Sequence, residues 1–249
     1  MNVLILAAGY ATRLYPLTLT RAKPLLDVAG RPMMEWVIDF LAPIPDIDRV
    51  FVVTNNKFAA DFEKWAQGYM IQQPKLRFTI VNDGSTSDAD KLGAIGDIQH
   101  VIQSQGIAGQ DLIVVAGDNL FSESLEGFAA FGKQHPATVA LYDVGDLEQV
   151  KKFNLVETDE AGVITRFEEK PANPINTQSA IALYYYRADV VPLFGTYIAE
   201  GNNPDQPGRF IEWLHKRVAV HTWPVPGKWF DIGSKETLEE AGNLWQAFS

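Results

Sequence analysis

The stretch of sequence that most strongly constrains the fold is residues 4–18, LILAAGYATRLYPLT, which is followed closely by Lys23. An apolar strand runs here into a turn of small residues around Gly9, and such a turn lets the backbone come close to a ligand. Arg13, Arg21 and Lys23 supply positive charge beside it. Taken singly, the small residues could mark tight packing and the cations could be solvated. The ordered set instead predicts a site that holds a polyphosphate.

This ordered set resembles the nucleotide-binding signature of the sugar-1-phosphate nucleotidylyltransferases, which reads roughly LAAGxGTRLxPLT followed by PKP. The chain carries Ala11 where the family usually has a second glycine, and Ala22 where it usually has proline. The methyl group of Ala11 makes a positive φ at this position unfavourable, although it removes no donor or charge. The chain contains no GxxxxGK[ST] motif and no GxGxxG motif that opens a helix after this strand, which disfavours the P-loop and dinucleotide-binding classes.

Composition narrows the function classes further. A chain of 249 residues, 47% of them hydrophobic, can bury a sizeable core. Its net charge of -10 argues against a nucleic-acid or anionic-membrane partner, because those surfaces require clustered positive charge. The absence of cysteine excludes disulfides and thiolate metal sites. Since the N-terminus reads as a core strand without a basic leader, and no apolar run could span a bilayer, a cytoplasmic protein is expected.

The first part of the chain alternates between apolar runs and segments of helical period. This alternation predicts an α/β fold with a Rossmann-like, mostly parallel sheet that has helices on both faces. The loop after Ala7 and the Gly117-Asp118 turn are expected at the carboxyl ends of its strands, where such sheets bind ligands. The expected strands are 3–7, 50–54, 76–81, 112–116 and 138–144, and the expected helices are 33–41, 58–69, 95–102 and 125–131.

The pattern changes after residue 144. Residues 155–158 and 163–167 read as a hairpin around an Asp-Glu-Ala-Gly turn, and the hairpin predicts a smaller mixed β-extension that recognises the sugar. A strand at 180–186, helices at 190–198 and 210–216, a strand at 218–223 and a helix from Lys235 follow. We expect one nucleotidyltransferase domain over residues 1–249, with a nucleotide-binding half of about 1–145 and a sugar-phosphate-binding half of about 146–249.

Two carboxylates are the candidate metal ligands. Asp118 follows an apolar strand through Gly117, and Asp231 lies in the sequence Trp-Phe-Asp-Ile-Gly before a helix. Either residue alone is more simply explained as a turn or helix-capping aspartate. Together they would form a hard oxygen site suited to Mg²⁺ that bridges phosphate oxygens. In the family that the chain resembles, an aspartate after the strand and a Trp-x-Asp-x-Gly aspartate hold the catalytic Mg²⁺, which implies this role for Asp118 and Asp231.

The sequence Phe-Glu-Glu-Lys-Pro at residues 167–171 matches the EEKP motif of the same family. The resemblance implies that Glu169 binds sugar hydroxyls and Lys170 contacts the sugar phosphate, whereas a solvated charge run is the alternative. Adjacent strand residues face opposite ways, so both can reach one pocket only if the strand bends near Pro171. Trp229 is either a platform for the sugar or a core residue. Asn154 stands where many thymidylyl relatives have a glycine near the sugar, which leaves the identity of the sugar open.

The resemblance also implies the nucleotide contacts. The backbone of Leu6, Ala7, Ala8 and Gly9 is expected to meet the nucleotide. Asn82, at a strand end, and Gly93 resemble the loop that reads the base, although the intervening segment 83–90 is longer and more acidic than in typical thymidylyl members. The four histidines share no metal-ligand spacing, and Arg209 is expected on the solvated surface.

These observations favour an enzyme that joins a nucleoside triphosphate to a sugar 1-phosphate and releases pyrophosphate, with Mg²⁺ as cofactor. The two substrates are anions, so the main task of the site is charge neutralisation and alignment for in-line attack. Arg13 is assigned to the β- and γ-phosphates and Lys23 to the α-phosphate. Lys170 is assigned to the incoming phosphate.

Three alternatives stay open on the sequence alone. The first is a cytidylyltransferase that acts on phosphocholine or a similar phosphate, for which Trp229 and the tyrosines at 184–186 could form an aromatic cage. The second is a regulatory subunit that binds nucleotide or nucleotide sugar without turnover, and the third is a metal-dependent glycosyltransferase. The choice among dTTP, UTP, GTP and CTP, the sugar, and the oligomeric state, monomer or homo-oligomer, are also open.

Overall fold

The computed structural model describes residues 1–246 of the chain. Its strands are β1 (Asn2–Leu6), β2 (Asp27–Val28), β3 (Arg31–Pro32), β4 (Arg49–Thr54), β5 (Phe78–Asn82), β6 (Leu112–Ala116), β7 (Asn119–Phe121), β8 (Ala137–Asp143), β9 (Asn154–Thr158), β10 (Ile164–Glu169), β11 (Gln178–Tyr186), β12 (Val220–Pro224) and β13 (Trp229–Asp231). Its α-helices are α1 (Met33–Leu41), α2 (Ala59–Gln72), α3 (Ala94–Gln105), α4 (Glu126–Gly132), α5 (Leu147–Val150), α6 (Leu193–Ala199), α7 (Pro207–Leu214) and α8 (Lys235–Trp245). Three short 3₁₀ helices also form, η1 (Thr12–Leu14), η2 (Leu17–Leu19) and η3 (Lys23–Leu25).

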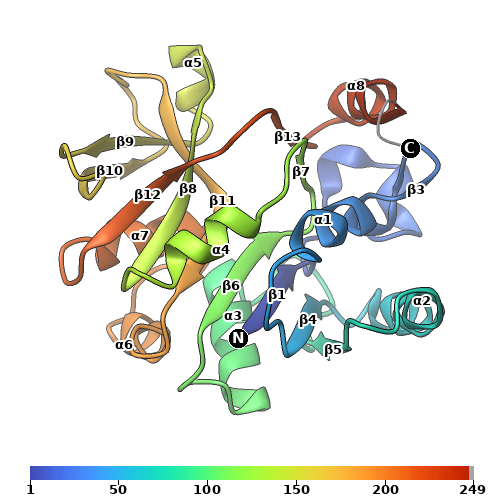
Figure 1. Cartoon of the computed structure of the whole chain (residues 1–249). Helices are drawn as coiled ribbons and strands as arrows, with labels where there is room; N and C mark the ends of the chain where they lie inside the picture. The colour runs from blue at the N-terminus through green and yellow to red at the C-terminus, as the bar shows by residue number, and fades with distance from the viewer. Residues whose placement is uncertain (247–249) are drawn as a thin grey trace. The chain divides into compact units, whose positions relative to one another are not determined.

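Seven of the strands belong to one sheet, in the order β12-β8-β11-β6-β1-β4-β5 (Figure 1). β4 pairs in parallel with both β1 and β5, and β12 pairs in parallel with β8, whereas β11 runs antiparallel to β8. The predicted α/β class with a mostly parallel sheet is therefore confirmed. The remaining strands form two-stranded ladders, β9 with β10, β7 with β13 and β2 with β3. The hairpin of β9 and β10 lies where the sequence predicted it, but the other two ladders were not foreseen.

The chain divides into two compact units. The first, which we call the terminal unit, comprises Asn2–Lys91, Val115–Glu126 and, within the described part of the chain, residues 227–246. The second, the central unit, comprises Leu92–Val114 and Gly127–Pro226, together with Met1. The expectation of one nucleotidyltransferase domain with two functional halves stays a prediction.

In the terminal unit, strands β1 and β4 consist largely of apolar residues, and these residues are buried. Val3, Leu4 and Ile5 of β1 are fully buried, and Val52 and Val53 of β4 are as well. Helix α2 contacts β5, the strand next to β4 (Figure 1). Helix α1 turns its apolar positions inward, and the side chains it buries are Met33, Met34, Trp36, Val37, Ile38 and Leu41. Ser234 caps the start of α8 with a capping box, where the sequence predicted a helix from Lys235.

The central unit is built around aromatic side chains. Phe194 of α6 stacks on Phe210 of α7 with ring centroids 3.9 Å apart, and Tyr186 of β11 meets both rings edge-on. All three residues are buried. Among the residues that the structure describes, no helix combines the length and the apolar composition needed to cross a membrane.

Candidate active site

The loop after β1 is anchored from the neighbouring strand. The N–H of Ala7 donates to the carbonyl of Val53, and the side-chain amide of Asn55 donates to the carbonyl of Ala8 at 2.9 Å. Asn55 is completely buried at the carboxyl end of β4. Sequence reasoning missed Asn55, although an asparagine directly after an apolar strand was a usable signal. The anchoring leaves Gly9 exposed, with no atom within 4 Å of the position that a Cβ would occupy.

Ala11 adopts the left-handed conformation, with φ 47° and ψ 45°. Alanine therefore takes a positive φ at this position in spite of its methyl group. The carbonyl of Ala11 accepts hydrogen bonds from the backbone N–H of Leu14 at 3.0 Å and from the hydroxyl of Thr18 at 2.8 Å. Thr18 is buried, and these two bonds offset the cost of a left-handed alanine, about 1–2 kcal/mol. The turn places Arg13 on η1 with an exposed side chain.

Gly117 lets the end of β6 approach both β1 and η3. Its N–H donates to the carbonyl of Leu6 at 3.0 Å. A Cβ at this position would lie 3.1 Å from the Leu6 carbonyl oxygen and 3.1 Å from Cγ of Pro24. The close approach sets Asp118 beside Lys23, whose Nζ lies 2.5 Å from Oδ2 of the carboxylate. Their side chains are 14% and 26% exposed, so the pair is partly shielded from water.

Asn119 joins Asp118 to the strand that carries the second aspartate. Its Nδ2 donates to Oδ1 of Asp118 at 2.9 Å, and its Oδ1 accepts from the indole Nε1 of Trp229 at 2.6 Å. Strands β7 and β13 pair antiparallel with Asn119 opposite Asp231. Sequence reasoning missed Asn119. Trp229, which was expected as a platform or a core residue, is half-buried and has its ring oriented by this bond.

Asp231 interacts electrostatically with Asp118, Lys23 and Arg13. Burial raises its pKa to about 6, with a further contribution from Asp118, while Lys23 and Arg13 oppose the shift. Arg13, Lys23, Asp118 and Asp231 thus form one electrostatic cluster. Arg21, in contrast, pairs with Asp27 through two hydrogen bonds of 3.0 and 3.2 Å. Within residues 1–246, no group of three or more histidine or carboxylate side chains is gathered for a metal ion.

In the central unit, Glu169 ends β10 beside α7. Its Oε2 is buried without a hydrogen-bond partner among the described residues. Burial raises the pKa of Glu169 to about 7, although Lys170 and Arg209 oppose the shift. The carboxylate fits because α7 has Gly208 here; a Cβ at Gly208 would collide with Oε2. Sequence reasoning missed Gly208, because its effect depends on a residue of another element.

Lys170 lies directly after β10 with φ 51°, and its N–H donates to the carbonyl of Phe153 at 2.9 Å. Its side chain is exposed. The sequence required a bend near Pro171 for Glu169 and Lys170 to reach one pocket, and the positive φ of Lys170 supplies a bend at this point. Arg209, expected on the surface, is partly buried, and its Nε donates to Oε1 of Gln206.

Asn154 carries a structural role that the sequence did not reveal. Its Nδ2 donates to the carbonyl of Ala180 at 2.9 Å, and its Oδ1 accepts from the N–H of the same residue at 2.7 Å. The hydroxyl of Ser179 donates to the Asn154 carbonyl. The buried amide therefore ties β9 to β11, and both of its polar atoms are engaged.

The two residues expected to read the base lie in different units. In the terminal unit, Oδ1 of Asn82 accepts from the N–H of Gly84, and its Nδ2 donates to the side chain of Asn56. In the central unit, Gly93 is the N-cap residue of α3 and has φ 78°, and a Cβ there would lie 2.7 Å from the carbonyl oxygen of Pro204. Both positions thus have a local structural explanation, and their role toward a base stays a prediction.

Comparison with known proteins identifies the family. The family model described as nucleotidyl transferase matches residues 2–247. The chain belongs to the nucleotidyl transferase family. The resemblance recognised in the sequence is thereby confirmed at the level of the family.

Relatives of this nucleotidyl transferase chain are distant in sequence. It is 26% identical over 242 residues to the bifunctional protein GlmU of Methanocaldococcus jannaschii. The aligned region covers 97% of this chain and 53% of the relative. It is 24% identical over 255 residues to a UTP–glucose-1-phosphate uridylyltransferase of Synechocystis sp., covering 99% of the chain and 62% of the relative. The chain therefore spans between half and two thirds of the length of these relatives.

Solved structures match the nucleotidyl transferase chain over its whole length. A Bacillus anthracis protein provisionally assigned as a glucose-1-phosphate thymidylyltransferase, solved with sucrose, superposes with a TM-score of 0.82 at 25% identity, covering 99% of this chain and 95% of that one. A UDP-glucose pyrophosphorylase in complex with UDP-glucose shares the fold, with a TM-score of 0.80 at 21% identity over 100% of this chain and 99% of the other.

Proposed function

We propose that the protein transfers a nucleotidyl group from a nucleoside triphosphate to a sugar 1-phosphate, giving an NDP-sugar and pyrophosphate. The observation that carries the proposal is the cluster at the ends of β1 and β6, where Lys23 pairs with Asp118 and both lie in the field of Asp231. Two anionic substrates can react only where positive charge offsets their repulsion, and this cluster provides that charge beside a loop with an exposed glycine.

In the reaction, a phosphate oxygen of the sugar 1-phosphate attacks the α-phosphorus in line. A new P–O bond forms, the bond from the α-phosphorus to the bridging oxygen breaks, and its electron pair leaves with pyrophosphate. Arg13 holds the β- and γ-phosphates, and the backbone of Leu6, Ala7, Ala8 and Gly9 lies along the nucleotide. Lys23 exchanges its bond with Asp118 for the α-phosphate, where negative charge accumulates.

Asp118 and Asp231 fit a hard divalent cation such as Mg²⁺. The raised pKa of Asp231 reflects, beside burial, repulsion between the two carboxylates, and a cation held between them would remove that repulsion. When bound, Mg²⁺ would neutralise charge on phosphate oxygens. Asn119 keeps Asp118 in a fixed orientation for this purpose by its hydrogen bond to Oδ1.

Glu169 and Lys170 are proposed to recognise the sugar phosphate in the central unit. With its pKa raised to about 7, Glu169 exchanges its proton near neutral pH and can both donate to and accept from a sugar hydroxyl. The exposed Lys170 is proposed to hold the incoming phosphate. The contacts of Asn82 and Gly93 with the base stay predictions, as do those of Asn154 and Trp229 with the sugar. A cytoplasmic location and the oligomeric state also stay predictions.

A pyrophosphate-release assay tests the proposal. dTTP, UTP, GTP, CTP and ATP are each combined with a panel of sugar 1-phosphates and with phosphocholine, in the presence of Mg²⁺. We expect release with at least one sugar 1-phosphate and its loss in Lys23→Ala. Release with phosphocholine alone would favour the cytidylyltransferase alternative. If the protein folds and binds nucleotide but releases pyrophosphate with none of the substrate combinations, a regulatory subunit would be favoured.

A further inference from the structure

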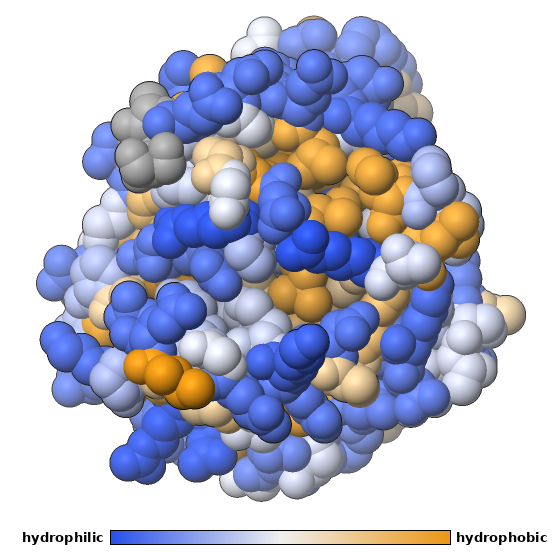
Figure 2. Space-filling view, turned by 90° about the vertical axis from the view of Figure 1, so that its right-hand side faces the viewer, coloured by the Kyte–Doolittle hydropathy of each residue, from blue (hydrophilic) through white to orange (hydrophobic). Residues whose placement is uncertain are grey.

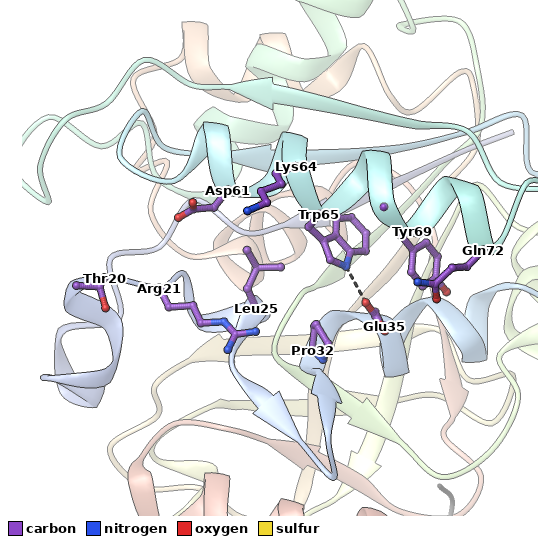
Figure 3. A pocket seen from close by; sticks show the side chains of 11 residues that line it. Thr20, Arg21, Leu25, Pro32, Glu35, Asp61, Lys64, Trp65, Tyr69 and Gln72 are labelled. Atoms are coloured by element: carbon purple, nitrogen blue, oxygen red, sulfur yellow. Dashed lines mark hydrogen bonds between the residues drawn. The ribbon is translucent and has the colours of Figure 1, made fainter.

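A cavity lies within the terminal unit, and its lining includes no member of the Arg13, Lys23, Asp118 and Asp231 cluster. It has a volume of about 610 Å³, which is within the usual range for small-molecule sites. Helix α2 forms one wall, and residues of η3, β3 and α1 form the other (Figure 3). Figure 2 shows the side of the molecule that carries α2, where apolar residues lie among hydrophilic ones.

The wall from α2 is one continuous helix face. Its lining residues recur at intervals of three and four, from Asp61 through Trp65 to Gln72. Gly68 stands in the middle of this face, exposed and with no atom within 4 Å of the place a Cβ would occupy. Glycine is less favourable than alanine inside a helix, and neither its backbone nor a neighbour requires it here. Its effect is to leave space in the wall of the cavity.

Trp65 gives this wall a rigid aromatic surface. Its ring stacks on Tyr69 with centroids 5.2 Å apart and meets Phe78 edge-on at 5.3 Å. The indole Nε1 donates to Oε1 of Glu35 at 2.8 Å, across the cavity from α2 (Figure 3). A partly exposed ring fixed in this way suits the apolar face of a ligand.

The charged groups of the lining are of both signs, although Arg21 is also paired with Asp27. Arg21 and Lys64 are cations, whereas Glu35 and Asp61 are carboxylates. An anionic ligand would meet the carboxylates, and a cationic ligand would meet Lys64 and Arg21. A hydroxyl group both donates and accepts, so a ligand rich in hydroxyls matches such a mixed lining best. We propose that this cavity is a carbohydrate site that takes a neutral sugar of one or two rings, with a ring face on Trp65 and hydroxyls on Glu35 and Lys64.

The lining of this cavity includes no residue assigned to the sugar 1-phosphate or to the nucleotide, but it is joined to Lys23 through the chain. Arg21 and Leu25 line the cavity, and Lys23 lies between them in sequence and pairs with Asp118. A sugar bound here would therefore contact the same short segment that positions Lys23.

Fluorine NMR of protein labelled with fluorotryptophan tests the proposal without any nucleotide. The probes are glucose, N-acetylglucosamine and maltose, with sodium phosphate and choline chloride as charged comparisons. The Trp65 resonance is assigned from its loss in Trp65→Phe. We expect at least one sugar to shift this resonance in a saturable manner, with a Kd of about 1 mM.

Gly68→Leu should weaken this binding by at least about 10-fold, because the added side chain fills the cavity. Gly242→Leu is the matched control, since Gly242 also lies inside a helix, α8, with no atom within 4 Å of its Cβ position. If Gly68→Leu does not fold, Lys64→Met replaces it, because Lys64 is exposed and its loss should also weaken binding.

The proposal is overturned if no sugar shifts the Trp65 resonance up to about 50 mM, or if the cavity variants bind as tightly as the control. A shift caused by phosphate or choline in place of the sugars would overturn the assignment to a neutral ligand. Since no turnover is measured, neither outcome bears on the nucleotidyl transfer reaction.

Discussion

The indole Nε1 of Trp229 lies 2.6 Å from Oδ1 of Asn119 and donates a hydrogen bond to it, across 110 positions of sequence. The same buried amide donates from Nδ2 to Oδ1 of Asp118. The orientation of the Asp118 carboxylate therefore depends on an aromatic residue of another strand.

Trp229→Phe keeps an aromatic ring and removes the donor. We expect the Mg²⁺ concentration that half-saturates pyrophosphate release to rise about 3- to 10-fold, and Asn119→Ala to have a larger effect, because outer ligands orient the residues that hold a metal. Trp36→Phe is the matched control, since its indole donates to the carbonyl of Val28 at 2.9 Å. Equal Mg²⁺ titrations for Trp229→Phe and Trp36→Phe would contradict the orienting role.

Lys23→Ala should lower kcat about 10²- to 10³-fold, as expected when one preorganised donor to the transition state is removed. The measurement is steady-state pyrophosphate release, with folding checked by circular dichroism. Lys57→Ala is the control, because Lys57 lies over the ring of Phe58. A near-normal kcat in Lys23→Ala would remove Lys23 from the reaction.

Asp231→Asn should abolish stabilisation by Mg²⁺ while the fold is kept. A ligand that binds only the native state raises Tm, and at about 100 times its Kd the gain is about 2.7 kcal/mol. Thermal unfolding with and without Mg²⁺ measures the effect. A Tm shift as large in Asp231→Asn as in the natural protein would show that the metal binds elsewhere.

Glu169→Gln should stabilise the protein at alkaline pH. The pKa of Glu169 is raised from 4.5 to about 7 in the folded state, so its favourable contribution is complete below about pH 4.5 and is lost as the pH rises through 7. We expect the variant to gain about 1–3 kcal/mol over the natural protein at pH 8, and little at pH 5.

Urea unfolding at both pH values measures this difference. Glu168→Gln is the neighbouring control, since Glu168 pairs with Arg166 at 2.9 Å. If Glu169→Gln were less stable than the natural protein at pH 8, burial of an unpartnered carboxylate would not be the dominant effect.

Ala11→Gly should raise the free energy of unfolding by about 0.5–1 kcal/mol. This gain is what remains of the relieved strain after the greater flexibility of glycine in the unfolded chain is subtracted. The reason is that Ala11 has a φ of 47°, which glycine adopts without strain. Ala42→Gly is the opposite case, because Ala42 has a φ of -56° in the right-handed region and should lose stability. Urea denaturation of both variants decides whether the left-handed turn is strained.

Local sequence patterns were sufficient to predict most of the strands and helices. The strand at Asn2–Leu6, the helix at Met33–Leu41 and the hairpin of β9 and β10 follow from apolar periodicity and turn residues, and all lie within one or two residues of their predicted limits. The β7–β13 ladder escaped prediction, because each partner has three residues and neither has a pattern of its own.

The candidate site, too, could be predicted only in part. Arg13, Lys23, Asp118, Glu169 and Asp231 could be picked from sequence, because each stands in a short motif whose residue types suit phosphate, metal or sugar. Their surroundings could not, since these depend on contacts between distant segments.

The sequence by itself therefore determined the class of fold, the family and the residues that carry charge. Only the tertiary structure decided how those residues are held. Thr18 stabilises the left-handed Ala11, Trp229 orients Asp118 through Asn119, and Gly208 admits the buried carboxylate of Glu169. The physical reason is that periodicity and motifs are local properties of a chain, whereas burial and hydrogen-bond partners are set by whatever the folded backbone brings next to a side chain.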